Sequence, residues 1–307
     1  SSLALLVGIL ALLFIGLQAS SAQYNPKRLL VYVGYARPQA HEKSLVLYDL
    51  QRRSTISQVS MPNYTFGYSP RWSPSGRYIA FFNWDEEYRS DLFLYDLQES
   101  KEIRLTEGDH NEICVNWAGS EEVLYSSTMD GRAIQAYRLN IRTGERIKIG
   151  EGLNIPCIAS SPDGERYVFA LYSDDENLPG RNYPETNVFI SNRAFTELVQ
   201  LTDTPFAKEH QPIWSPDGNY IVYSVGEYDE SGEYVSSRLM VMNLEDRSTQ
   251  EISSQNEGFP SYNWLSDGRL TYTNELTNSE LGYQRLYQID IVTGTRSFVD
   301  LPEYAWF

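Results

Sequence analysis

Few side chains of this sequence suit acid–base chemistry or metal binding, and they lie far apart in the chain. Two of the three histidines, His110 and His210, each stand near a glutamate, Glu112 and Glu209. An imidazole next to a carboxylate can move protons or bind a metal ion. The alternative is that the histidines are ordinary loop or channel-rim residues. The glutamates would then line a channel mouth or accept backbone hydrogen bonds.

Two acidic segments could bind calcium, which prefers clustered carboxylate and carbonyl oxygens. One contains Asp174, Asp175 and Glu176, and the other contains Asp229. Their spacing does not match that of an EF-hand loop, so solvated acidic loops are the alternative. We therefore expect no cofactor and no metal site, with calcium left open.

Aromatic residues near these acids could instead contact a partner, because tryptophan and tyrosine are enriched at interface hot spots. Trp84 lies beside two acids, and the alternative is that its indole packs onto a neighbouring loop. The candidate partner-binding residues are Trp84, Asp85, Glu86, Tyr88, His110, Asp174, Asp175, Glu209, His210, Tyr228, Asp229 and Tyr234.

The two cysteines, Cys114 and Cys157, could form a disulfide. Each stands three residues before the anchor of a sequence repeat, at equivalent points of neighbouring strands. A disulfide needs Cα atoms no more than about 7 Å apart. Neighbouring inner strands could meet that limit or slightly exceed it, so a bridge and two free thiols both stay open.

Charge narrows the classes of partner. The chain of 307 residues has 25 Lys and Arg against 41 Asp and Glu, a net charge of −16. Nucleic-acid binding needs a basic face that neutralises phosphates, and docking on anionic lipid needs a polybasic patch. We expect neither, and a partner with a basic or neutral surface fits better.

The first segment has the pattern of a secretory signal. Residues 3–17 are apolar and uncharged, and small residues precede Gln23. A signal-peptide core has about 7–15 apolar residues, whereas a membrane-spanning helix needs about 20. We predict a signal peptide over 1–22 and a periplasmic or secreted domain over 23–307. An uncleaved membrane anchor is the alternative, and both place the domain outside the cytoplasm.

A repeated element must position these candidates. The phrase RWSPSGRYIAFF at 71–82 returns as IWSPDGNYIVYS at 213–224, with weaker copies at 116–127, 159–170 and 263–274. Their anchor residues, usually tryptophan, are 43 to 54 residues apart. Ser-Pro-Asp-Gly makes a tight turn, and an aromatic, β-branched strand follows. This period indicates the blades of a β-propeller.

The number of repeats predicts the architecture. A third-strand pattern occurs six times. The first repeat starts at 29–34 with the pattern of a second strand, and residues 302–307 have the pattern of a first strand. We predict an all-β, six-bladed propeller with four antiparallel strands per blade, closed by a C-terminal strand that completes the first blade. The recurring tryptophans should pack between blades. The alternative to closure is that the chain continues into another turn.

The repeated phrase resembles the WD40-like PD40 repeat of TolB-type six-bladed propellers, over residues 24–307. Propellers of this kind also occur in prolyl-oligopeptidase-type peptidases and some polysaccharide lyases. The peptidases need a Gly-x-Ser-x-Gly nucleophile elbow, which this sequence lacks. TolB has an α/β domain before its propeller, and the residues between Gln23 and the first blade are too few for one.

These patterns lead us to expect a non-enzymatic, extracytoplasmic binding module. Its protein or peptide partner should bind the face with the acidic, aromatic loops between second and third strands, or the channel mouth, because binding residues concentrate on loops of rigid scaffolds. Two alternatives stay open. One is a carbohydrate-active, lyase-like propeller, and the other is an accessory subunit tethered to an envelope complex by an uncleaved N-terminal helix.

Overall fold

The computed structural model describes residues 29–35, 43–61, 70–85, 87, 89–128, 134–172, 185–205, 207–229, 231–256, 260–274, 285–299 and 305–306. Every regular element among them is a β-strand. These residues include no helix of the length and apolar character that a membrane crossing requires. The signal peptide predicted over 1–22 lies outside them.

Four sheets of the described chain have four strands each. The first consists of β24 (Ala305–Trp306), β1 (Leu29–Tyr35), β2 (Lys43–Asp49) and β3 (Ser54–Met61). The second consists of β4 (Arg71–Trp72), β5 (Tyr78–Trp84), β6 (Ser90–Asp96) and β7 (Lys101–Arg104). The third consists of β8 (Glu112–Trp117), β9 (Glu122–Ser127), β10 (Gln135–Asn140) and β11 (Arg146–Ile149). Another consists of β20 (Tyr262–Trp264), β21 (Arg269–Asn274), β22 (Arg285–Asp290) and β23 (Arg296–Val299).

The remaining sheet has eight strands. They are β12 (Cys157–Ser160), β13 (Arg166–Tyr172), β14 (Thr186–Asn192), β15 (Leu198–Gln200), β16 (Ala207–Trp214), β17 (Tyr220–Tyr228), β18 (Tyr234–Asn243) and β19 (Thr249–Asn256). One parallel pair, Thr186 with Lys208, joins β14 to β16, and the other pairings are antiparallel.

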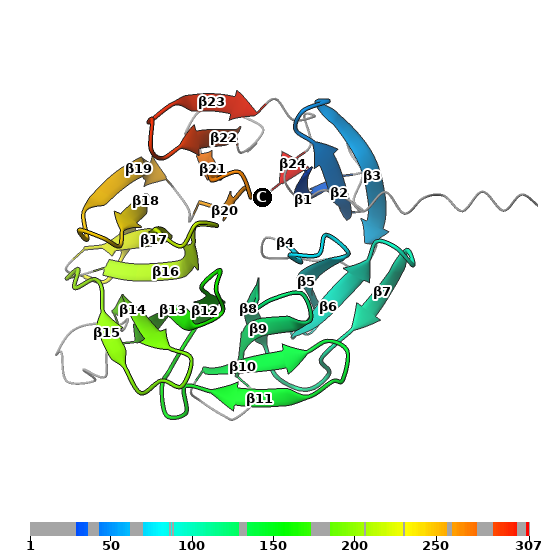
Figure 1. The fold of residues 1–307 in the computed structure, drawn as a ribbon, viewed down its shortest axis with the longest axis horizontal. Helices are drawn as coiled ribbons and strands as arrows, with labels where there is room; N and C mark the ends of the chain where they lie inside the picture. Colours follow the sequence, from blue (N-terminus) through cyan, green and yellow to red (C-terminus); the bar gives the residue numbers. More distant parts are fainter. Residues whose placement is uncertain are drawn as a thin grey trace, which may run out of the picture.

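The sheets form a ring around a central axis, with β4, β8, β12 and β20 toward the centre and β3, β7, β11, β19 and β23 toward the rim (Figure 1). The predicted all-β propeller is confirmed. The prediction of six separate four-stranded sheets is met only in part, because the bridge between β14 and β16 merges two sets of strands into one sheet.

Closure of the ring joins distant parts of the chain. Strand β24 pairs antiparallel with β1, with Val33 opposite Trp306 and Gly34 opposite Ala305. The predicted pairing of the C-terminal strand with the first blade is therefore confirmed. Because the pairing covers a sheet edge, it leaves fewer backbone groups open to other chains.

The Ser-Pro-Asp-Gly turns use both side-chain hydrogen bonds and a glycine. Between β16 and β17, the backbone N–H of Tyr220 donates to Ser215 Oγ at 2.9 Å, and Ser215 Oγ donates to Asp217 Oδ1 at 2.5 Å. Gly218 has φ of +75°, a conformation that strains residues with a Cβ. The turn therefore requires the residue types that repeat in the sequence.

The hydrophobic core lies between neighbouring sheets. Trp72 packs against a cluster formed by Leu45 and Leu47 of β2 with Ile79 and Phe81 of β5. Trp117 packs against a second cluster, and Trp214 and Trp264 share a third. Their predicted role in packing between blades is confirmed.

Candidate functional site

Glu209, in β16, holds a connection between two sets of strands. Its carboxylate is fully buried and accepts hydrogen bonds from the backbone N–H of Val188 at 2.9 Å, from Thr204 Oγ1 at 2.9 Å and from Thr202 Oγ1. Thr186 Oγ1 donates to its backbone oxygen at 2.8 Å. Burial raises the pKa of Glu209, although these hydrogen bonds oppose the shift. Glu209 thus accepts backbone and threonine donors, one of the two alternatives from the sequence.

Glu112, at the start of β8, occupies the corresponding place one sheet earlier. It is fully buried, and its backbone oxygen accepts a hydrogen bond from Ser90 Oγ at 2.6 Å. His110 Nε2 lies 3.1 Å from Glu112 Oε1. Burial raises the pKa of Glu112, whereas Ser127 and His110 lower it.

The two histidine–glutamate pairs are separate: His110 precedes Glu112 of β8, whereas Glu209 and His210 lie in β16. Strand β12 contacts both β8 and β16 and lies between them (Figure 1). Burial, with a smaller effect of Lys208, lowers the pKa of His210 to about 4. His210 is therefore neutral near pH 7. In the described part of the chain, no three His, Cys, Asp or Glu residues gather as metal ligands.

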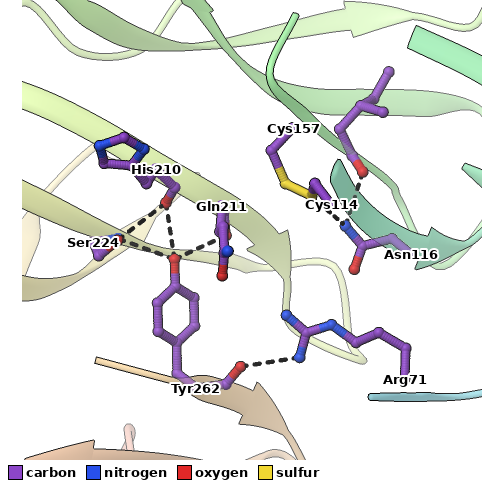
Figure 2. Close-up of a disulfide and its surroundings, with 9 residues drawn as sticks. Arg71, Cys114, Asn116, Cys157, His210, Gln211, Ser224 and Tyr262 are labelled. Carbon is purple, nitrogen blue, oxygen red and sulfur yellow. Dashed lines mark hydrogen bonds between the residues drawn. A yellow bond between two sulfur atoms is a disulfide. The ribbon is translucent and has the colours of Figure 1, made fainter. Parts of the chain in front are cut away.

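Cys114 and Cys157 form a disulfide between β8 and β12, with Cα atoms 5.3 Å apart. Cys114 lies in a β-bulge and has φ of 53°. Beside the bridge, Asn116 Nδ2 donates to the backbone oxygen of Ile158 at 2.9 Å (Figure 2). Of the two alternatives from the sequence, the disulfide is therefore the one present.

A tyrosine links two further inner strands, β20 and β16. The hydroxyl of Tyr262 lies 2.8 Å from the backbone oxygen of His210 and 2.9 Å from that of Gln211, and can donate to either. It accepts a hydrogen bond from the backbone N–H of Ser224 at 3.1 Å (Figure 2). Gln211 lies in a bulge with φ of 49°, like Cys114. Covalent and hydrogen-bonded contacts thus connect inner strands around the axis.

The acidic loop after β5 is partly neutralised. Asp85 is exposed, and its carboxylate lies 2.7 Å from Arg89 Nη2. Arg89 also pairs with Asp109 at 2.8 Å and with Glu87 at 3.1 Å. Trp84, the last residue of β5, is partly buried.

Two of the candidate partner-binding residues, Tyr228 at the end of β17 and Tyr234 at the start of β18, lie in contact. The rings of Tyr228 and Tyr234 meet edge to face with centroids 5.8 Å apart. Lys208 Nζ lies 5.3 Å from the ring centroid of Tyr228. Asp229 caps the exposed turn between the two strands, and Val235 next to Tyr234 is 60% exposed. Four candidates, Glu86, Tyr88, Asp174 and Asp175, lie outside the described residues.

A cavity of about 510 Å³ lies in the centre of the ring, toward the Ser-Pro-Asp-Gly turns. Its lining residues include Trp72, Trp117, Trp214 and Trp264. Of its described lining residues, Arg71 alone is a Lys, Arg, His, Asp or Glu.

Arg71, in β4, was not among the residues that sequence reasoning selected. It is 8% exposed, and its Nη1 donates to the backbone oxygen of Tyr262 across the ring at 3.2 Å (Figure 2). Burial lowers the pKa of Arg71. One sequence signal could have found it, because the residue before each anchor is uncharged in the other copies of the phrase: Asn116, Ala159, Ile213 and Asn263.

The sequence matches the PD40 family, described as the TolB beta propeller domain, over residues 21–264. The chain therefore belongs to the TolB beta-propeller family. No curated protein matches the sequence significantly.

Solved structures show the same fold at low sequence identity. TolB from Acinetobacter baumannii is 16% identical with a TM-score of 0.69, and the match covers 91% of this chain but 64% of that one. The β-propeller domain of the Trilobed protease from Pyrococcus furiosus is 16% identical with a TM-score of 0.54, covering 90% and 82%. It is described as an open velcro topology, whereas here β24 pairs with β1.

An enzyme is also similar in fold. An oligogalacturonate lyase in complex with manganese is 14% identical with a TM-score of 0.51, covering 90% of this chain and 75% of the lyase. Structural similarity at this level of identity defines the propeller and leaves its function open.

Proposed function

We propose that this chain is a non-enzymatic propeller module that binds a protein or peptide partner. The observation that carries the proposal is the match to the TolB beta-propeller family over residues 21–264. The partner contacts the loops between second and third strands. A compact aromatic pair, Tyr228 and Tyr234, and the exposed Val235 support this choice of face. The net charge of −16 favours a partner with a basic or neutral surface.

We also propose that the ring consists of six blades. Support comes from the eight-stranded sheet, in which a single parallel pair, Thr186 with Lys208, connects β12–β15 to β16–β19. Division at that pair gives two sets of four strands, like the other sheets.

We place the domain outside the cytoplasm, in the periplasm or secreted. The bridge between Cys114 and Cys157 supports this location, because disulfides persist in oxidising compartments. The predicted signal peptide over 1–22 and domain over 23–307 belong to the same proposal, with a membrane anchor as the alternative.

The absence of catalysis is also part of the proposal. Its support is the environment of a buried carboxylate in the inner strand β16. Glu209 accepts hydrogen bonds from Val188, Thr202 and Thr204, which hold a connection between strands. A lyase-like activity on a polyuronate is the competing function, favoured by the similarity to the manganese-containing lyase.

Substitution of the aromatic loop residues tests the partner-binding face. We expect the triple variant W84A/Y228A/Y234A to lose at least tenfold in partner recovery from native envelope extract, measured by quantitative mass spectrometry, because aromatic anchors dominate interface energies. Val292→Ala is the matched control, since Val292 is 80% exposed in a turn between third and fourth strands. Equal recovery with all three proteins would contradict the proposed face. Cleavage of polygalacturonate by the wild type would contradict the absence of catalysis.

A further inference from the structure

We propose that the central cavity is a second binding site, which takes a carboxylate carried on an apolar group and pairs it with Arg71. This site lies toward the Ser-Pro-Asp-Gly turns, whereas the proposed partner loops are at the opposite ends of the strands. The inference therefore does not depend on the partner-binding face.

The first observation is the isolation of the guanidinium charge. Arg71 is more than nine-tenths buried, and no ion pair joins it to any Asp or Glu that the structure describes. Within the described residues, its guanidinium donates a hydrogen bond to the backbone oxygen of Tyr262. A guanidinium has five N–H donors, and buried charges in proteins are normally paired. An anion in the cavity would supply the missing partner.

Another arginine shows how this chain normally treats such a group. Arg77 is partly exposed, yet its Nε and Nη2 both donate to the carboxylate of Asp96, the shorter contact being 2.7 Å. Arg71 is far more buried, and no Asp or Glu of the described ranges pairs with it in this way. The Arg71 guanidinium could form a bidentate pair with the carboxylate of a ligand. Such pairs are strong and specific in geometry.

The cavity walls define the rest of the ligand. Tryptophan, proline, leucine and isoleucine residues line the cavity around the single cation, together with uncharged serines and asparagines. A volume of about 510 Å³ lies within the usual range for small-molecule sites. One guanidinium without a second cation suits a monoanion better than a phosphate dianion. The chemistry that fits is a carboxylate on an aromatic or aliphatic group, at a peptide C-terminus or in a small free acid.

Titration with three probes tests the proposal on the full folded chain. The probes are a pool of acetylated apolar tripeptides with free C-terminal carboxylates, the same pool as C-terminal amides, and phenylacetate. Calorimetry measures affinity, and the Arg71 Nε–H resonance reports contact with the guanidinium. We expect carboxylate probes to bind and shift this resonance, while the amides bind at least tenfold more weakly.

Variants of Arg71 distinguish an effect on carboxylate binding from an effect on the stability of the fold. We expect R71Q to weaken carboxylate binding about ten- to a hundredfold, in line with the strength of charge-assisted hydrogen bonds, and R71K to retain part of it. R142Q is the matched control, because the Arg142 side chain is 77% exposed and outside the cavity lining. Thermal unfolding checks that each variant is folded, and R71K serves as the test if R71Q does not fold.

The outcomes distinguish the ligand sources. Binding of tripeptides alone identifies a peptide C-terminus, and binding of phenylacetate as well shows that a free acid suffices. Equal affinity for acids and amides, no effect of the Arg71 substitutions, or no probe binding at 10 millimolar would overturn the inference. None of these results bears on partner recovery through the loops between second and third strands.

Discussion

At the scale of single residues, two glutamates at the same position of the repeat link neighbouring sets of strands. Glu112 and Glu209 are both fully buried. The backbone oxygen of each accepts a hydrogen bond from a hydroxyl of the preceding third strand, β6 or β14. Those hydroxyls belong to Ser90 and Thr186. These contacts join β6 to β8 and β14 to β16, strands that are not consecutive in the chain.

The raised pKa of Glu209 predicts a pH-dependent stability. In the folded state Glu209 keeps its proton to higher pH than in the unfolded state. Between the unfolded pKa, near 4.5, and the raised folded pKa, folding is therefore coupled to proton uptake. Glu209 therefore costs stability as the pH rises through its folded pKa. We expect the free energy of unfolding of E209Q to gain on that of the wild type between pH 4.5 and 7.5, measured by urea denaturation.

Exposed Glu165 offers the matched substitution, E165Q, for this comparison. A difference between wild type and E209Q that stays constant with pH, or that changes in the opposite direction, would contradict the assigned environment of Glu209.

Residue-level prediction from the sequence succeeded where a pattern repeats and failed where a residue departs from it. The tryptophans recur at one position, and their packing between sheets followed from that recurrence. Arg71 is a single charged residue at a position otherwise uncharged, and its burial depends on the reach of its side chain across the ring to Tyr262. No local pattern encodes that distance.

At the scale of elements, bulges on the inner strands control what meets at the axis. Cys114 and Gln211 both have positive φ and both lie at register shifts, in β8 and β16. A bulge re-aims side chains and increases local twist. The bulge at Cys114 accompanies the approach to Cys157 in β12, with Cα atoms 5.3 Å apart.

The disulfide should stabilise the folded state. The bridge closes a loop with a sequence separation of 43 residues, and such a constraint contributes about 2–4 kcal/mol, chiefly through the unfolded chain. We expect the double variant C114S/C157S to lose about that much free energy of unfolding in guanidinium denaturation. Reduced wild type should match it. A loss below about 0.5 kcal/mol would contradict a stabilising bridge.

The strands were more predictable than the contacts between them. The Trp-Ser-Pro-Asp-Gly phrase places a turn between two strands, because its serine, aspartate and glycine each satisfy a requirement of that turn. The disulfide stayed open at the sequence level, because the distance between β8 and β12 depends on the bulge at Cys114 and on the curvature of the ring. These properties arise from packing between sheets.

At the scale of the whole molecule, the ring separates two surfaces. The cavity with Arg71 opens toward the Ser-Pro-Asp-Gly turns, while Tyr228 and Tyr234 stand at the opposite ends of their strands. Pairing of β24 with β1 joins the last and first strands of the described chain in one sheet. A scaffold of paired strands lowers the ordering cost that a partner has to meet on binding.

Site-specific photo-crosslinking tests the central claim, partner binding through one face, most directly. A benzoyl-phenylalanine at position 235, which is 60% exposed beside Tyr234, should crosslink a discrete protein or peptide in the native envelope. The same probe at position 292, 80% exposed in a turn between third and fourth strands, should give none. Crosslinks at 292 with none at 235 would contradict the account, as would no crosslink at either position.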